Sequence, residues 1–173
     1  MEIRKQPDGD IWLQQEKYTA DVLKRYDMTD CRPASTPLPP PCKLSKVDSP
    51  TTAKGIKDME LVPYRSAIGS MMYLAVCTRP DISATVSALI SFNANPGRAH
   101  WEGVQHVLRY LEGIVSSGIR YCKGASTDIW GFTDASHLTC PDTSRSRTGF
   151  ALICWGCRYL AKQVDRKCLS VEL

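Results

Sequence analysis

The order of apolar and polar residues predicts a β-hairpin and a short helix at the start of the chain. Two short runs that contain apolar residues, 2–5 and 11–13, flank Pro7-Asp8-Gly9-Asp10. Asp-Gly favours the positive φ angles that a tight hairpin turn needs. The residues that then recur at helical spacing are Tyr18, Val22, Leu23 and Tyr26. We therefore expect a short helix to pack on the hairpin within residues 1–30.

A proline-rich stretch separates this unit from the rest of the chain. Seven of the eleven prolines fall between Pro33 and Pro63, among Ser, Thr, Lys and Asp residues. Proline lacks the amide donor that a helix or sheet uses, and it biases its predecessor out of the helical region. Residues 31–63 are therefore predicted to form an exposed, mostly irregular linker, and the main domain boundary is placed there.

Three helices are predicted within residues 64–117. Their apolar stripes are Tyr64, Ile68, Met71 or Met72, and Ala75 in the first; Ile82, Val86, Leu89 and Ile90 in the second; and Trp101, Val104, Leu108, Leu111 and Val115 in the third. The second helix is expected to start at Thr78-Arg79-Pro80-Asp81, because the Thr78 hydroxyl can cap it and Pro80 fits the first turn. Arg79 is expected to form a local salt bridge there. Stripes of this kind form hydrophobic cores.

After residue 118 the pattern changes from helical to strand-like. The short runs rich in β-branched and aromatic residues are 119–122, 129–133, 149–155 and 158–160, and turn formers such as Gly124 separate them. We predict that these runs form one antiparallel sheet. The pattern as a whole indicates an α+β fold.

Length and composition are those of a globular protein with one domain or two small ones. No apolar run approaches the roughly 18 residues that span a bilayer, and no apolar signal-peptide core follows Met1. We therefore expect an intracellular protein, cytoplasmic or nuclear, that is neither secreted nor bound to a membrane. The eight cysteines are then expected to be free thiols.

The net charge of +4 is concentrated near the C-terminus. Residues 143–168 hold six Lys and Arg residues and one acid, Asp165, so this stretch carries +5 and the rest of the chain −1. Lys and Arg gain affinity for polyanions because counterions are released on binding. The stretch therefore fits a nucleic-acid partner, and a solvated charged face is the alternative.

Asp134 is a candidate functional acid. It follows the apolar run 129–133, where a strand would hold its carboxylate at the edge of a sheet. A single Asp in that place is typical of a turn. A metal site would need a second carboxylate, and the candidate for it is Glu172.

Blocks of residues along nearly the whole chain resemble the C-terminal part of a copia-type retrotransposon polyprotein. The matching blocks are residues 13–18, 36–38, 64–74, 78–82, 100–101, 107–113, 131–135 and 145–150. Their order is specific as a set, whereas any one block alone would be weak. The resemblance implies the end of a reverse transcriptase, a connecting segment and the start of a ribonuclease H domain.

The resemblance also implies a division of the chain. Residues 1–30 would end the reverse transcriptase as a palm- or thumb-like hairpin and helix, and residues 64–117 would be thumb- or connection-like helices. Residues 118–173 would form an incomplete ribonuclease-H-like domain. The parent protein would copy retrotransposon RNA into DNA and hydrolyse the RNA strand of the hybrid.

Partners and contact residues follow from the same resemblance. The expected partners are an RNA·DNA or DNA duplex and the rest of the Pol polyprotein. The candidate nucleic-acid contacts are Arg109, from a matching block, and Arg145, Arg147 and Lys162, from the basic stretch.

By position, Asp134 matches the first metal-binding aspartate of the family's ribonuclease H, and Glu172 matches the glutamate that opens its first helix. Such sites hold two Mg²⁺ ions with several convergent carboxylates. The family uses four acidic positions, of which this chain has two, so weak Mg²⁺ binding is expected. The chain also lacks the Asp-Asp pair of the family's polymerase. We therefore expect neither polymerase nor ribonuclease H activity from this chain alone.

Two other hypotheses stay open. One is a non-catalytic nucleic-acid-binding or interaction module. The other is a zinc ribbon, because the spacing of His137, Cys140, Cys154 and Cys157 is similar to that of paired zinc knuckles, although cysteines of an ordinary hairpin fit it too. A redox dithiol would need Cys154 at a helix start rather than in a strand.

The remaining histidines offer no metal pair. His100 and His106 lie six residues apart on one predicted helix, so they do not share a face as metal ligands at i and i+4 do. We expect them to be surface residues or hydrogen-bonded core residues.

Overall fold

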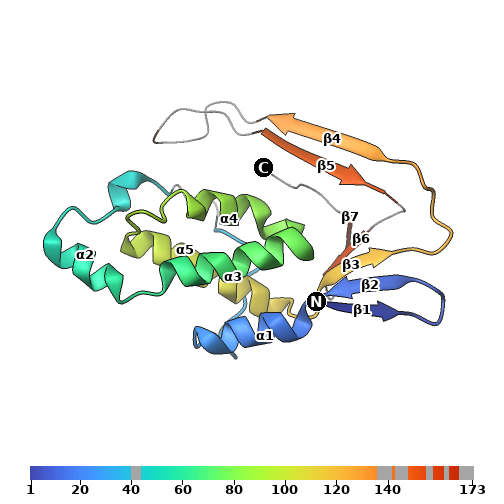
Figure 1. Ribbon diagram of the computed structural model, residues 1–173, viewed down its shortest axis with the longest axis horizontal. Coiled ribbons are helices and arrows are strands. Elements are labelled where there is room, and N and C mark those ends of the chain that lie inside the picture. Colours follow the sequence, from blue (N-terminus) through green and yellow to red (C-terminus); the bar gives the residue numbers. More distant parts are fainter. Residues whose placement is uncertain (40–43, 136–141, 143–147, 155–157, 162–163, 168–173) are drawn as a thin grey trace.

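A computed structural model describes residues 1–39, 44–135, 142, 148–154, 158–161 and 164–167 (Figure 1). The α+β class is confirmed, because these residues form an N-terminal antiparallel hairpin, five α-helices and small antiparallel sheets. No helix among them is long and apolar enough to cross a membrane.

The predicted N-terminal hairpin is confirmed. Strand β1 (Glu2–Lys5) pairs antiparallel with β2 (Ile11–Gln14). Gly9 in the turn has a φ of 92°, a conformation that glycine adopts without steric cost. Helix α1 (Glu16–Arg25) starts two residues after β2 and buries Val22 and Leu23, as the spacing predicted.

The core lies among α1 and three later helices, α3 (Tyr64–Cys77), α4 (Ser83–Ile90) and α5 (Arg98–Gly113). The predicted stripes largely form it, and in α3 it is Met71 that is buried, while Met72 is exposed. One predicted core position is wrong, because Ile90 is exposed at the end of α4. Val115 lies past the end of α5 but packs against the core, as predicted.

The start of the second predicted helix differs from the expectation. A 3-10 turn, Pro80–Ile82, precedes α4, and Arg79 stands before it. The Thr78 hydroxyl does not cap the turn but donates to Gln15 Oε1 at 2.8 Å. The local salt bridge of Arg79 is confirmed, with Asp81 as its partner.

The segment predicted as an exposed, irregular linker is more ordered than expected. It contains a 3-10 turn (Lys46–Asp48) and helix α2 (Ala53–Glu60), whose N-cap Thr52 accepts a hydrogen bond from the Gly55 amide. The pattern missed α2 because the helix is short and buries no residue completely.

Residues 31–39 and 44–49, which we call the strap, run antiparallel along α5. The Ala34 amide donates to the Arg109 carbonyl at 3.2 Å. Further along the strap, His106 Nε2 donates to the Thr36 carbonyl and His100 Nε2 to the Ser45 carbonyl, each at 3.0 Å. The strap is therefore docked on α5 through its main chain.

The later strands do not form the single sheet that was predicted. Strand β3 (Gly118–Tyr121) joins the N-terminal hairpin, in a sheet of order β1-β2-β3-β6-β7 with β6 (Arg158–Ala161) and β7 (Val164–Lys167). Strands β4 (Trp130–Ala135) and β5 (Thr148–Ile153) pair separately. β3 begins soon after α5 and pairs with the free edge of β2. The prediction of a single sheet was wrong because this pairing joins β3 to the N-terminal hairpin rather than to β4.

Candidate nucleic-acid interface

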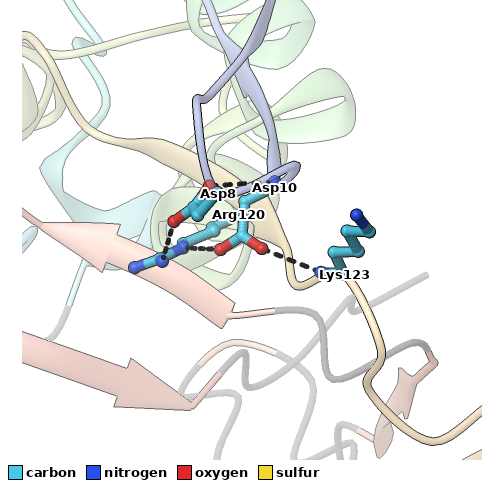
Figure 2. A network of polar contacts seen from close by, with 4 residues as sticks. All are labelled: Asp8, Asp10, Arg120 and Lys123. Atoms are coloured by element: carbon cyan, nitrogen blue, oxygen red, sulfur yellow. Dashed lines mark hydrogen bonds and ion pairs between the residues drawn. The ribbon is translucent and has the colours of Figure 1, made fainter.

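A polar network fixes the hairpin that carries α1. The Asp10 carboxylate accepts hydrogen bonds from Arg120 Nε at 2.5 Å and from the Lys123 amide at 2.8 Å (Figure 2). These contacts, the Lys123 amide first, hold the pKa of Asp10 below its usual value. Asp8 adds an ion pair with Arg120 at 3.3 Å. The hairpin turn is therefore tied to β3, and α1 follows directly from the fixed β2.

Helix α1 lies antiparallel beside α3, and polar and aromatic contacts join them. The Tyr26 hydroxyl donates to Ser66 Oγ at 3.0 Å, and Arg25 NH1 reaches Ser70 Oγ at 3.5 Å. At the other end the rings of Tyr18 and Tyr73 meet edge to face, with centroids 5.0 Å apart. These pairs leave a guanidinium, several hydroxyls and three aromatic rings along one seam.

The outer face of α3 continues this seam with apolar residues open to solvent. The exposed positions of α3 at helical spacing are Arg65, Gly69, Met72, Tyr73 and Val76. Val76 is 79% exposed. A Cβ added at Gly69 would meet no atom within 4 Å, so the helix backbone is open to close approach there. We call α1 and this stripe the α1–α3 face.

The chemistry of the α1–α3 face suits a sugar-phosphate backbone. Arg and Ser or Tyr hydroxyls are common donors to phosphate oxygens, and such contacts position a protein on a duplex without reading its sequence. Arg25 and Ser66 offer these groups. Met72 and Val76 offer apolar contact for sugars, and Gly69 leaves room for them.

The predicted contact Arg109 takes part in the packing of the strap. Its Nε donates to the Arg32 carbonyl at 2.8 Å, and its own carbonyl accepts from Ala34. Arg109 therefore holds the strap to α5, and its half-buried guanidinium is directed to the main chain. Arg145, Arg147 and Lys162 lie outside the residues that the structure describes.

Asp134 is exposed on β4, where it pairs with Gly149 of β5. Its expected partner Glu172 lies outside the described residues. Within the described part of the chain, no three His, Cys, Asp or Glu residues come together to hold a metal ion. A two-metal site needs several convergent carboxylates, and among the described residues Asp134 is the only member of the predicted pair.

The structure describes three of the histidine and cysteine candidates, His100, His106 and Cys154. His100 and His106 are hydrogen-bonded to carbonyls of the strap, which confirms them as satisfied residues. Cys154 is a half-buried free thiol after β5. The other three residues of the zinc-ribbon pattern, His137, Cys140 and Cys157, lie outside the described residues.

Sequence reasoning missed the α1–α3 face. The available signal was the composition of α3, where Tyr73 and Val76 fall outside the predicted core stripe and place apolar residues on a second side of the helix. A helix of that kind is covered by something on each face. The partner contacts of Arg25 and Ser70 depend on tertiary packing and give no local signal.

Comparison with known proteins finds several relatives of this chain. It is 41% identical over 171 residues to the retrovirus-related Pol polyprotein from transposon TNT 1-94 of Nicotiana tabacum, which covers 98% of this chain. The chain is homologous to copia-type retrotransposon Pol polyproteins over nearly its whole length. It spans 13% of the tobacco polyprotein.

Two relatives from Arabidopsis thaliana support this homology. The Pol polyprotein from transposon RE2 is 34% identical over 150 residues, which are 87% of this chain and 10% of the polyprotein. The uncharacterized mitochondrial protein AtMg00810 is 33% identical over 167 residues, which are 96% of this chain and 65% of that protein. No protein-family model matches the chain. No solved structure matches it either.

Proposed function

We propose that the chain is the part of a retrotransposon Pol polyprotein that joins the end of the reverse transcriptase to the start of ribonuclease H. Its role would be to grip an RNA·DNA or DNA duplex through the α1–α3 face. The observation that carries this proposal is the open face of α3 beside Arg25, Ser66 and Tyr73, in a chain homologous to Pol polyproteins.

In this proposal each part of the face has its own task. Arg25 and Ser66 bind phosphates, and their contacts with α3 and α1 hold these groups in place before binding. Met72 and Val76 pack on the sugars. Gly69 lets the duplex approach the helix, because any side chain there would project into the space that the duplex fills.

The β4–β5 ribbon would be the beginning of the ribonuclease-H-like part. Trp130 is 63% exposed, and so is Leu152, which lies on the opposite face because it pairs with the neighbouring Gly131. A two-stranded ribbon is marginally stable in water by itself. Apolar side chains on both faces therefore support its membership in a larger β-unit. In that unit Asp134 and Glu172 would be Mg²⁺ ligands.

Duplex binding is tested by fluorescence anisotropy, in which the full chain is titrated into a labelled RNA·DNA hybrid. Arg25→Ala should weaken binding roughly five- to tenfold. The slope of log affinity against log salt concentration should become shallower by about one unit, the value for one lost phosphate contact. Gly69→Gln should weaken it by steric blocking and leave the salt dependence unchanged. Lys57→Ala, on exposed α2, removes the same charge away from the face and serves as the matched control.

The outcomes separate the hypotheses. Equal losses for Arg25→Ala and Lys57→Ala would mean that net charge alone attracts the duplex, and the proposed face would be wrong. No binding of hybrid or DNA duplex by the full chain at low salt would contradict the proposal altogether. Salt-dependent binding without cleavage of the RNA strand is the result expected for this chain.

A further inference from the structure

His100 is fully buried and makes two hydrogen bonds of opposite kind. The Gly97 amide donates to its Nδ1 at 2.8 Å, so Nδ1 must be without a proton. Its Nε2 lies 3.0 Å from the Ser45 carbonyl, which can only accept, so Nε2 carries the hydrogen. The ring also stacks on Phe92, with centroids 3.9 Å apart. The site therefore requires the neutral imidazole with its hydrogen on Nε2.

Ser45 links this histidine to a distant part of the chain. Its hydroxyl donates to Asp142 Oδ1 at 2.6 Å, and the next amide, that of Lys46, donates to the same carboxylate at 3.0 Å. Asp142 belongs to the connection between β4 and β5. The Ser45 end of the strap thus joins the N-terminal end of α5 to Asp142.

We propose that His100 is a proton-operated latch, which holds the strap, and Asp142 with it, to α5 when the ring is neutral and releases both when the ring is protonated. This inference does not depend on nucleic-acid binding. It concerns how α5 is coupled through the strap to Asp142.

Protonation would replace an attraction by a repulsion at Nδ1. The imidazolium has no acceptor, so its new N–H would face the Gly97 N–H at hydrogen-bond distance. The ring cannot retreat within the site because Phe92 lies against one of its faces. The Asp48 carbonyl also packs tightly on Gly97, where a Cβ would meet it at 1.9 Å. The strain is therefore relieved when the strap moves away from α5.

Charged groups of both signs lie on the strap and on α5. The Ser45 hydroxyl and the Lys46 amide hold the pKa of Asp142 below its usual value, so its carboxylate is a negative charge beside Ser45. Asp48 on the strap carries a further negative charge, and its carboxylate accepts from the Ser45 amide. Lys46 on the strap and Arg98 on α5 carry positive charge, and Glu102 on α5 forms an ion pair with Arg98.

His106 provides a matched control on the same helix. Its Nε2 donates to the Thr36 carbonyl of the strap, a bond that both the neutral and the protonated ring can make. The two histidines therefore bind the same strap, but only His100 makes a second contact, with the Gly97 amide, that requires an unprotonated nitrogen.

The test is hydrogen exchange of the amides of residues 45–49 in the full chain, corrected for intrinsic exchange, at about pH 8 and about pH 5. Protection of the wild-type amides should fall roughly fivefold or more on acidification, the effect of losing about one net hydrogen bond. His100→Gln should show low protection at both pH values, and His106→Gln should keep the wild-type response. Asp142→Asn should lower protection but retain the pH response.

A nuclear magnetic resonance titration of the wild-type chain removes dependence on the variants. The midpoint at which the His100 ring protonates must match the midpoint at which the Ser45 and Lys46 amides shift. Different midpoints would overturn the proposal. The same pH response in His100→Gln as in the wild-type chain would overturn it too, as would unchanged protection of the wild-type strap between the two pH values.

Discussion

The Arg79 guanidinium, 1% exposed, forms two parallel hydrogen bonds to the Asp81 carboxylate, from Nε to Oδ1 at 3.1 Å and from NH2 to Oδ2 at 2.9 Å. Its remaining nitrogen, NH1, donates to the Ile114 carbonyl at 3.3 Å, and the guanidinium carbon lies 5.7 Å from the centre of the Tyr110 ring. One side chain therefore fastens the turn before α4 to the end of α5.

Arg79→Lys should destabilise the protein by about 2–3 kcal/mol, because an ammonium cannot make the forked contact and leaves buried acceptors without donors. Urea unfolding followed by circular dichroism measures this. The control is Arg98→Lys, since Arg98 pairs with Glu102 on the exposed surface of α5 and should change stability by less than about 0.5 kcal/mol. Equal effects at both positions would contradict the proposed role of Arg79.

Asp10 should make the stability of the protein depend on acid pH. Its folded pKa lies below the usual value, so its contribution is complete above the pKa of the unfolded chain, about 4, and is lost as pH falls through the folded pKa. Urea midpoints between about pH 7 and about pH 2.5 should therefore fall less steeply for Asp10→Asn than for the wild-type chain. Asp21→Asn, on the exposed side of α1, is the control and should follow the wild-type slope.

Gly69→Ala should stabilise the protein by about 0.5–1 kcal/mol, because the position is exposed, lies inside a helix and has open space for a Cβ. Gly97→Ala should do the opposite, since its Cβ would meet the Asp48 carbonyl at 1.9 Å. Thermal unfolding of the two variants gives the comparison. A loss of stability in Gly69→Ala would show that α3 is covered at this point in solution.

Tyr64→Phe should cost about 1 kcal/mol. The buried Tyr64 hydroxyl donates to the Leu89 carbonyl at 2.7 Å, and its removal deletes one buried hydrogen bond at the end of α4, although the carbonyl still accepts from the Phe92 amide. Burial also raises the pKa of Tyr64 above its usual value, so the hydroxyl stays protonated at alkaline pH. Chemical denaturation measures the loss, and Tyr73→Phe, whose ring is exposed, is the control that should stay close to wild type.

The helices that form the core, α1, α3, α4 and α5, could be predicted from the sequence because their signals are local. The 3-4 spacing of Val104, Leu108 and Leu111 directly reports which side of α5 is buried. The Asp8-Gly9 turn is local in the same way, because two residues determine its backbone conformation. Helix α2 carried a weaker signal, since no residue in it is fully buried.

The arrangement of the strands and the candidate interface could not be predicted in this way. Leu13 and Ile119 are more than 100 residues apart in the chain, and nothing near either residue specifies that they pair. Arginine is a residue type that often contacts phosphates, but in the fold Arg109 Nε donates to the Arg32 carbonyl. The α1–α3 face likewise depends on contacts such as Arg25 with Ser70, which exist only once the helices have packed.

The central position of α5 has a consequence for synthesis on the ribosome. This helix packs against α1, α3 and α4 and also carries the strap, yet it is the last of the five to be translated. The apolar sides of the earlier helices that pack on α5 therefore stay exposed until residue 113 has left the exit tunnel. A nascent chain stalled before that point should bind chaperones and be cut readily by proteases, whereas one stalled well beyond it should resist both.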